Sequence, residues 1–171
     1  MALMNPMKQI QIDKVVVNIS VGQSGQPLIN AMTILEQLTN QRPCQRVAKQ
    51  TVRQFGIRKG EPIACLVTLR GEKAEEFLTK ALRAARNQIK AKNFDDNGNF
   101  AFGISEHIDI PGTRYDPNLG IVGMDVVVTL ERPGYRVKRR KRGRTKVGSI
   151  HRVSKDEGIE FIKEKFGIEV E

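Results

Sequence analysis

Apolar residues alternate with polar or small residues in several short segments of the chain. The alternation is clear in residues 13–20, 62–70, 100–104 and 124–130. Because successive side chains of a strand point to opposite faces of a sheet, each segment predicts a strand with one buried face. A further strand is expected over residues 45–50, after the turn at Pro43.

Three other segments show the apolar spacing of helices packed against a core. The first covers residues 27–40, and the second, residues 72–91, repeats apolar residues at i, i+3, i+4 and i+7. In the third, Ser154 and Glu157 form a capping box at the start and Gly167 ends the helix. The buried side of the first helix is expected to contain Leu28, Ile29, Met32, Leu35 and Leu38.

The order of these elements favours an α+β fold, in which helices pack on one face of an antiparallel sheet. No internal repeat and no linker divides the sequence, so residues 1–171 are expected to form a single domain. Residues 1–7 are expected to be flexible. Residues 111–123 are rich in Gly and Pro and are expected to form a long surface loop.

Positive charge is concentrated in two windows. The 171 residues include 29 Lys and Arg and 19 Asp and Glu, for a net charge of +10. Residues 37–60 contain six bases and residues 132–152 contain ten, without any acid, which leaves 13 of the 29 bases among all 19 acids elsewhere. Two cationic windows on an acidic scaffold indicate two surfaces for a polyanion, foremost nucleic acid. Basic runs are also typical of solvated faces or, for residues 138–142, of a localisation signal.

Motifs of catalysis, metal binding and cofactor binding are missing from the sequence. The glycines of residues 22–25 and 56–60 lack the Lys-Ser/Thr ending of a phosphate loop. Cys44 and Cys65 each stand alone, so core packing is expected for both rather than a zinc site. Residues 106–109 include His107 between acids, but no nucleophile accompanies them. We therefore expect neither an enzyme nor a cofactor.

Nothing in the sequence predicts insertion into a membrane or secretion. No stretch approaches the roughly 18 apolar residues of a membrane span, and the first residues lack the pattern of a secretory signal. With only two cysteines, a disulfide framework is excluded. The chain is expected to be soluble and intracellular.

Residues 51–61 combine the groups that a structured RNA requires. Arg53, Arg58 and Lys59 surround Phe55, so that cations for phosphates lie beside a ring for base stacking. Phe55 folded back under its loop is the alternative. Aromatic residues make up only 5% of the chain, which argues against base-by-base reading of a single strand. Structured RNA, bound by its shape and backbone, fits better.

Several motifs occur together and in a fixed order. They are KVVVNIS (residues 14–20), NQRP (40–43), FGIRKGEP (55–62), VTLRG (67–71) and EHIDIPGTRYDPNLGIVGMD (106–125). Together they resemble the universal large-subunit ribosomal protein family numbered five, the L-five family, over about residues 8–166. Residues 132–152 resemble its archaeal and eukaryotic branch.

The resemblance implies a structural constituent of the large ribosomal subunit that binds 5S rRNA and helps anchor it in the central protuberance. By motif position, Asn18, Gln41, Phe55 and Thr68 correspond to residues of the family that contact 5S rRNA. Three further residues are weaker candidates because of their positive charge: Arg42, Lys49 and Arg70.

Further partners follow from the same resemblance. Residues 53–60, with Arg53, Arg58 and Lys59, are expected to approach P-site tRNA, and residues 111–123 to face a protein of the small-subunit head across an intersubunit bridge. Other proteins of the central protuberance are also expected neighbours, in a cytoplasmic ribosome. Large-subunit rRNA is the expected partner of Lys138, Arg139, Arg140, Lys141, Arg142 and Arg144.

The residues alone leave other functions open. A free RNA chaperone or translational repressor would show the same charge pattern. An RNA-processing or RNA-modifying enzyme would need a site that the motif search missed. A polybasic protein of the membrane surface would need an amphipathic basic helix, which the Gly-interrupted residues 132–152 do not provide.

Overall fold

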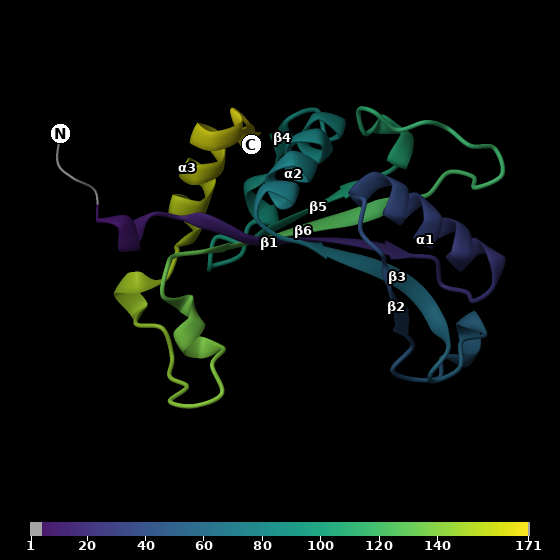
Figure 1. Cartoon of the computed structure of the whole chain (residues 1–171), viewed down its shortest axis with the longest axis horizontal. Helices are drawn as coiled ribbons and strands as arrows, with labels where there is room; N and C mark the ends of the chain where they lie inside the picture. Colours follow the sequence, from purple (N-terminus) through teal and green to yellow (C-terminus); the bar gives the residue numbers. More distant parts are fainter. Residues whose placement is uncertain (1–4, 171) are drawn as a thin grey trace.

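The computed structural model describes residues 5–170, and its centre is a five-stranded antiparallel sheet with the order β2-β3-β1-β6-β5 (Figure 1). All strands predicted for this sheet are found, although the first begins two residues earlier than expected and the strand expected over residues 45–50 covers only 44–47. The strands are β1 (Gln11–Ser20), β2 (Cys44–Val47), β3 (Pro62–Leu69), β5 (Phe100–Ile104) and β6 (Met124–Glu131).

One face of this sheet is apolar and packs under two helices, as the alternation predicted. Val17 of the central strand is fully buried and lies opposite Val67 of β3 and Val126 of β6. Helices α1 (Gln26–Thr39) and α2 (Glu72–Ala84) cover this face (Figure 1). The predicted α+β class is therefore confirmed.

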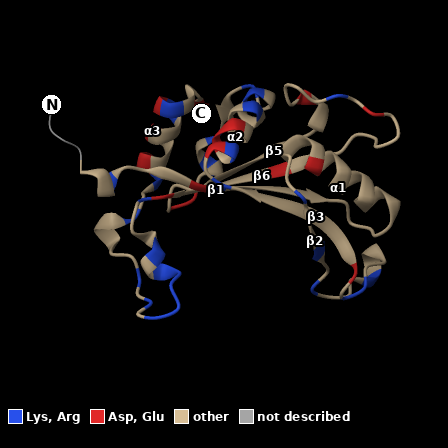
Figure 2. Cartoon of the chain, in the orientation of Figure 1, with Lys and Arg blue, Asp and Glu red and all other residues tan. Residues whose placement is uncertain are grey.

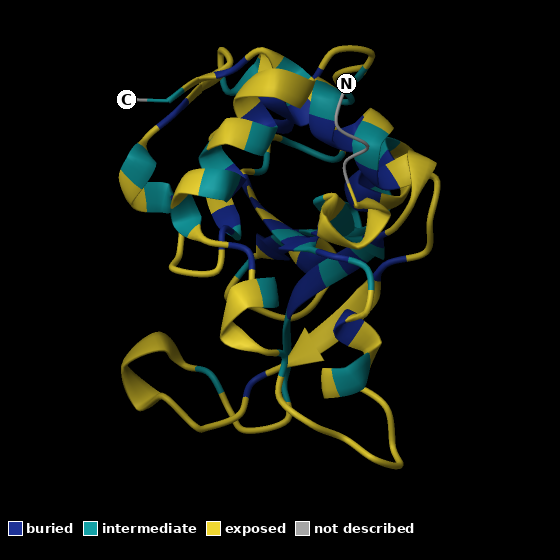
Figure 3. Cartoon of the chain, turned by 90° about the vertical axis from the view of Figure 1, so that its left-hand side faces the viewer, coloured by how far each residue is buried: buried dark blue, intermediate teal, exposed yellow. Residues whose placement is uncertain are grey.

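The opposite face of the sheet, which we call the open face, has no helix over it among residues 5–170 (Figures 1 and 3). Because side chains alternate along a strand, the neighbours of the buried residues point to the open face. Its residues include Val16, Asn18, Leu66, Thr68, Ala101, Gly103, Asp125 and Val127. Several of them are exposed.

The second helix is shorter than predicted. It ends well before residue 91, because Arg86 and Asn87 have positive φ angles of 57° and 55°. The chain then forms β4 (Gln88–Ile89), which pairs in parallel with β7 (Glu169–Val170). Ile89, near the predicted end of the helix, is buried as expected, but it reaches the core from the strand β4.

Helix α1 is rotated slightly from the predicted orientation. Ile29 was expected on the buried side but is 53% exposed, whereas Leu28, Ala31 and Leu35 are buried. Leu28, Ala31 and Leu35 are spaced i, i+3 and i+7 and therefore lie on one stripe of the helix. Ile29 follows Leu28 directly and is rotated from it by about 100° around the helix axis. Ala31, which was not among the residues expected on the buried side, is fully buried.

Helix α3 (Lys155–Phe166) begins and ends as predicted. The Ser154 side chain accepts from the Glu157 N–H and the Glu157 carboxylate accepts from the Ser154 N–H, which completes the capping box. The start of α3 contacts the turn before β5: a Cβ on Gly158 would lie 2.8 Å from the backbone of Gly98. Only glycine permits this approach of two backbones.

Short 3-10 turns connect these elements. Of the predicted flexible segment 1–7, residues 1–4 lie outside the described residues, and Asn5 caps the first of these turns. None of the helices described in residues 5–170 is long and apolar enough to cross a membrane. The turns cover Pro6–Lys8, Arg53–Phe55, Ala91–Asn93, His107–Asp109, Tyr135–Lys138 and Ser149–His151.

Candidate nucleic-acid interface

The two cationic windows project from the sheet on the same side. We call residues 48–61, between β2 and β3, the hairpin tip, and residues 132–152 the basic extension. Figure 2 shows Lys and Arg gathered on both, at opposite ends of the open face and away from α1 and α2. The view in Figure 3 agrees, with both projections largely exposed. The fold thus places the separate windows around one surface.

Backbone hydrogen bonds hold the hairpin tip in a defined shape. Val52 and Ile57 each donate an N–H to the carbonyl of the other, and Gly56 turns the chain with a φ of 69°. The Arg58 N–H donates to the Glu61 carboxylate. A hydrogen bond from the Ser24 hydroxyl and this N–H lower the pKa of Glu61 below its ordinary value.

This loop presents its aromatic ring and its cations to solvent. Phe55 is 75% exposed, so the alternative in which it folds back into the core is wrong. Arg53, Arg58 and Lys59 are exposed, and none of them forms an ion pair with a residue between 5 and 170. Ring and charges are free for an external partner.

The other residues predicted for 5S rRNA lie on or beside the open face. Asn18 donates to the Ser20 hydroxyl over 3.0 Å, and the Gln41 amide donates to the carbonyl of Thr68 over 3.2 Å. The structure therefore brings Asn18, Gln41 and Thr68 together on neighbouring strands β1 and β3 and the loop that follows α1. Arg42 and Lys49 are exposed. Phe55 does not join this cluster, because it lies out on the hairpin tip.

One predicted RNA residue, Arg70, is engaged within the protein. Its guanidinium pairs with the Asp13 carboxylate, which also pairs with Arg139 over 3.0 Å. Burial opposes ionisation of Asp13, but hydrogen bonds from Arg139 and Arg70 outweigh it and lower the pKa of this carboxyl. Through Asp13, the pair with Arg139 ties the basic extension to the strand β1.

A second arginine pair anchors the basic extension. Arg132 is buried and donates to the Glu157 carboxylate over 2.7 Å and to the carbonyls of Lys8 and Arg152. Hydrogen bonds from the Ser154 N–H and from Arg132 lower the pKa of Glu157. Arg132 therefore contributes no charge to an outer surface, although the charge count included it.

Arg139 also has a role that the sequence did not reveal. Its guanidinium bridges Asp13 and Glu131, and these carboxylates raise its pKa. Lys138 lies over the ring of Tyr135, with 4.8 Å between its Nζ and the ring centroid. The remaining predicted rRNA residues of the basic extension are exposed without an ion pair in the described chain: Arg140, Lys141, Arg142 and Arg144.

Tyr135 organises the basic extension, and the sequence reasoning missed it. The residue is buried, its hydroxyl donates to the carbonyl of His151, and it accepts from the N–H of Val153. The only signal in the sequence was a lone tyrosine among bases, which equally fits a stacking ring. Its burial assigns it to the interior of the extension.

Residues 111–123 form the predicted long loop, on the helix side of the sheet (Figure 1). Asn30 of α1 donates to the carbonyl of Asn118, and the N–H of Val122 donates to Nδ1 of His107. Burial lowers the pKa of His107, which thus serves as an acceptor at the base of the loop.

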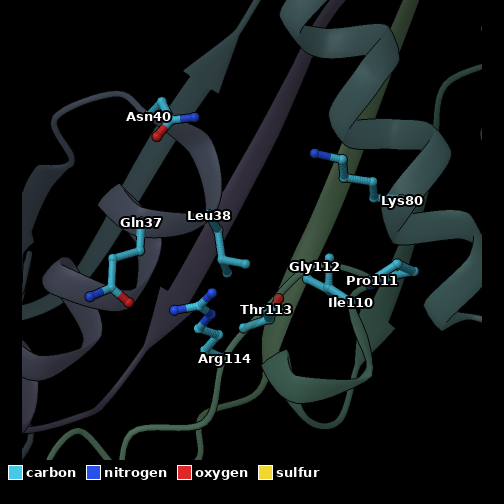
Figure 4. Close-up of a pocket in the computed structure, with 9 residues that line it drawn as sticks. All are labelled: Gln37, Leu38, Asn40, Lys80, Ile110, Pro111, Gly112, Thr113 and Arg114. Carbon is cyan, nitrogen blue, oxygen red and sulfur yellow. The ribbon is translucent and has the colours of Figure 1, made fainter.

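A hollow of about 360 Å³ lies where this loop meets α1 and α2 (Figure 4). Lys80 of α2 and Arg114 of the loop line it, and the side chain of Leu38 of α1 lies between them in this view. The hollow lies on the helix side of the sheet and the open face on the opposite side, so the two are separate surfaces.

The cysteines behave differently from one another. Cys65 is fully buried, and burial raises the pKa of its thiol to about 11, as expected for a packing residue. Cys44 was also expected in the core but is exposed, because β2 is an edge strand and its side chain points to the open face opposite Leu66.

Two family models match the sequence. Residues 5–58 match the model of ribosomal protein L5, and residues 62–161 match the model of the C-terminus of the same ribosomal family. Strands from both matched regions interleave in the one central sheet.

Relatives cover almost the full length. The large ribosomal subunit protein uL5 of Sulfurisphaera tokodaii is 53% identical over 167 residues, which cover 97% of this chain and 94% of that protein. The proteins of the same name from Pyrobaculum aerophilum and Methanococcoides burtonii are 52% and 48% identical, over 98% of this chain and 93% and 99% of theirs.

These relatives are structural proteins of the ribosome, which is cytoplasmic in archaea, and their family is not known for enzymes. RNA binding and a role in translation are consistent with that family. The resemblance seen in the motifs is therefore confirmed: the chain belongs to the ribosomal protein L5 family of the large ribosomal subunit.

Proposed function

We propose that the open face binds 5S rRNA and helps anchor it in the central protuberance of the large subunit. The observation that carries the proposal is geometric: both cationic projections lie on the same side of the sheet as Asn18 and Thr68. A folded RNA laid along this face would meet positive charge at both ends.

Different groups on this surface have different roles in RNA binding. Exposed Lys and Arg residues neutralise phosphates and supply most of the affinity, which depends on salt. The amides of Asn18 and Gln41 and the hydroxyl of Thr68 set the position of the RNA, since they are held by hydrogen bonds or by the sheet. Phe55 offers a ring on which a base stacks.

Other parts of the molecule fit further partners. The free cations Arg53, Arg58 and Lys59 suit an approach to P-site tRNA. The outer bases of the basic extension suit large-subunit rRNA. Residues 111–123 face the other side of the sheet, which suits a protein of the small-subunit head, and the remaining surface is open to other proteins of the central protuberance.

A free RNA chaperone or repressor is the function that must be distinguished. The experiment is a filter-binding titration of the purified protein with 5S rRNA at about 0.2 M salt, a level that suppresses non-specific phosphate attraction. Excess tRNA serves as competitor. We expect tight binding that survives the competitor; binding that tRNA abolishes would reduce the protein to a general binder of RNA and overturn the proposal.

A further inference from the structure

An acidic side chain without an ion-pair partner in the described chain stands on the otherwise cation-flanked open face. Asp125 of β6 lies opposite Asn18 of the central strand and opposite Gly103 of the edge strand β5. It is exposed, and its carboxylate forms neither an ion pair nor a hydrogen bond with any residue between 5 and 170. A carboxylate in this place repels phosphates, so it requires a separate explanation.

The carboxylate lines a shallow, widely open hollow of about 430 Å³ together with Asn18, Ser20, Gly103, Ser105 and Gly123. Backbone forms one rim of the hollow at Gly103, where an added Cβ would make an ordinary contact of 3.8 Å with Oδ1 of Asp125. A Cβ on Gly123 would lie 2.9 Å from the carbonyl oxygen of Ser105, so this rim is also built from backbone.

Three side-chain oxygens that can only accept, from Asn18 and Asp125, line the hollow beside the hydroxyls of Ser20 and Ser105, which can donate as well as accept. Asn18 uses its amide N–H to bind the Ser20 hydroxyl, which leaves its side-chain oxygen free to accept. Asp125 adds two acceptor oxygens. A group that binds the Asp125 carboxylate must therefore bring N–H or O–H donors, and an RNA phosphate brings none.

Among the groups of an RNA, base edges supply such donors. Unpaired bases present their Watson–Crick edges to proteins, and Asp or Glu side chains accept from base N–H groups. Guanine carries two adjacent donors on that edge, N1–H and the exocyclic amine, and they match the two oxygens of one carboxylate. We propose that Asp125 reads the Watson–Crick edge of an unpaired guanine in the bound RNA, with Asn18 beside it.

This inference rests on the proposed binding of 5S rRNA and adds a specificity-determining residue to it. The direction in which Asp125→Asn changes RNA affinity distinguishes base recognition from simple electrostatic repulsion. Asp125→Asn removes a negative charge from an RNA-binding face, which by itself strengthens binding. If the carboxylate reads guanine, the same change weakens binding, because the new amide N–H group opposes a donor of the base.

The affinity test uses the full chain and 5S rRNA at about 0.2 M salt with tRNA competitor. We expect Asp125→Asn to weaken 5S rRNA binding by roughly 5- to 150-fold, the range of one lost bidentate base contact. The control is Glu76→Gln, which removes an exposed acid from α2 on the covered side and should leave affinity within about twofold. Unchanged or tighter binding by Asp125→Asn would overturn the inference.

Kethoxal, which modifies N1 and N2 of unpaired guanine, gives a second readout at base resolution. With protein saturating, the wild type should protect at least one guanine of 5S rRNA that Asp125→Asn leaves reactive, while other protected positions stay protected. Equal protection by both proteins would overturn the role of Asp125 but leave the proposed function standing. If the wild type itself fails to bind 5S rRNA in the presence of tRNA, the proposed function and this inference both fall.

Discussion

The hairpin tip and the basic extension are both rich in bases but use them differently. In the hairpin tip, backbone hydrogen bonds form the loop, and no cation there pairs with a carboxylate of residues 5–170. In the basic extension, Arg132 and Arg139 bind carboxylates of the body, and only the outer cations are free. The number of bases in a segment therefore does not measure its positive surface. The positions of carboxylate partners in the fold decide how much charge is left.

The largest expected effect comes from removing the anchor of the basic extension. Arg132→Ala should lower the free energy of unfolding by about 2–4 kcal/mol, because it removes charge-assisted hydrogen bonds and leaves the carbonyls of Lys8 and Arg152 without their donor. Urea unfolding measures it. Arg142→Ala, an exposed change in the same segment, should stay within about 0.5 kcal/mol of wild type. Equal stability of both variants would contradict the division between anchoring and free bases.

An effect on RNA binding without an effect on stability is expected at the hairpin tip. Phe55→Ala should weaken 5S rRNA binding by about 1–3 kcal/mol, the value of one stacked base. Its stability should remain unchanged, since the ring is 75% exposed. Tyr115→Ala is the matched control, because it removes an aromatic ring that is 54% exposed on the helix side of the sheet. Identical affinities of the two variants would remove Phe55 from the RNA site.

The smallest effect concerns two arginines inside the basic extension itself. Arg142→Ala should reduce the slope of log affinity against log salt for large-subunit rRNA by roughly 0.7–0.9, the value of one phosphate contact. Arg139→Ala should leave the slope unchanged, because its guanidinium already bridges Asp13 and Glu131. Titrations between about 0.1 and 0.4 M salt measure both slopes. A slope that falls only for Arg139→Ala would reverse the assignment.

Local patterns predicted most of the elements correctly, and the errors have nonlocal causes. The alternation in β1 and the capping box at Ser154 are properties of neighbouring residues, and both are confirmed. The end of α2 depends on β7, a strand about eighty residues further along the chain, so the apolar spacing up to residue 91 was misleading. The exposure of Cys44 follows from the position of β2 at the sheet edge, which strand order alone decides.

For the candidate site, too, the sequence predicted individual residues but not their arrangement in space. The motifs selected Asn18, Gln41 and Thr68, and the structure brings them together, although their contact with RNA stays a prediction. Asp125 was not selected from the sequence, because the alternation of its strand indicates an outward-facing side chain but not which residues of other strands or which cationic windows lie beside it. Its place opposite Asn18 emerged only from the register of β1 and β6.

Residue order was sufficient to predict the five strands of the central sheet and the presence of three helices, the two cationic windows, and the family. Each of these depends on composition or short spacing, which a linear pattern contains. The folded chain was needed to show that both windows project on one side of the sheet and that Arg132 and Arg139 are neutralised. The Arg139 partner Asp13 is 126 residues away in the chain, and this ion pair exists because the antiparallel pairing of β1 with β6 brings the two segments together.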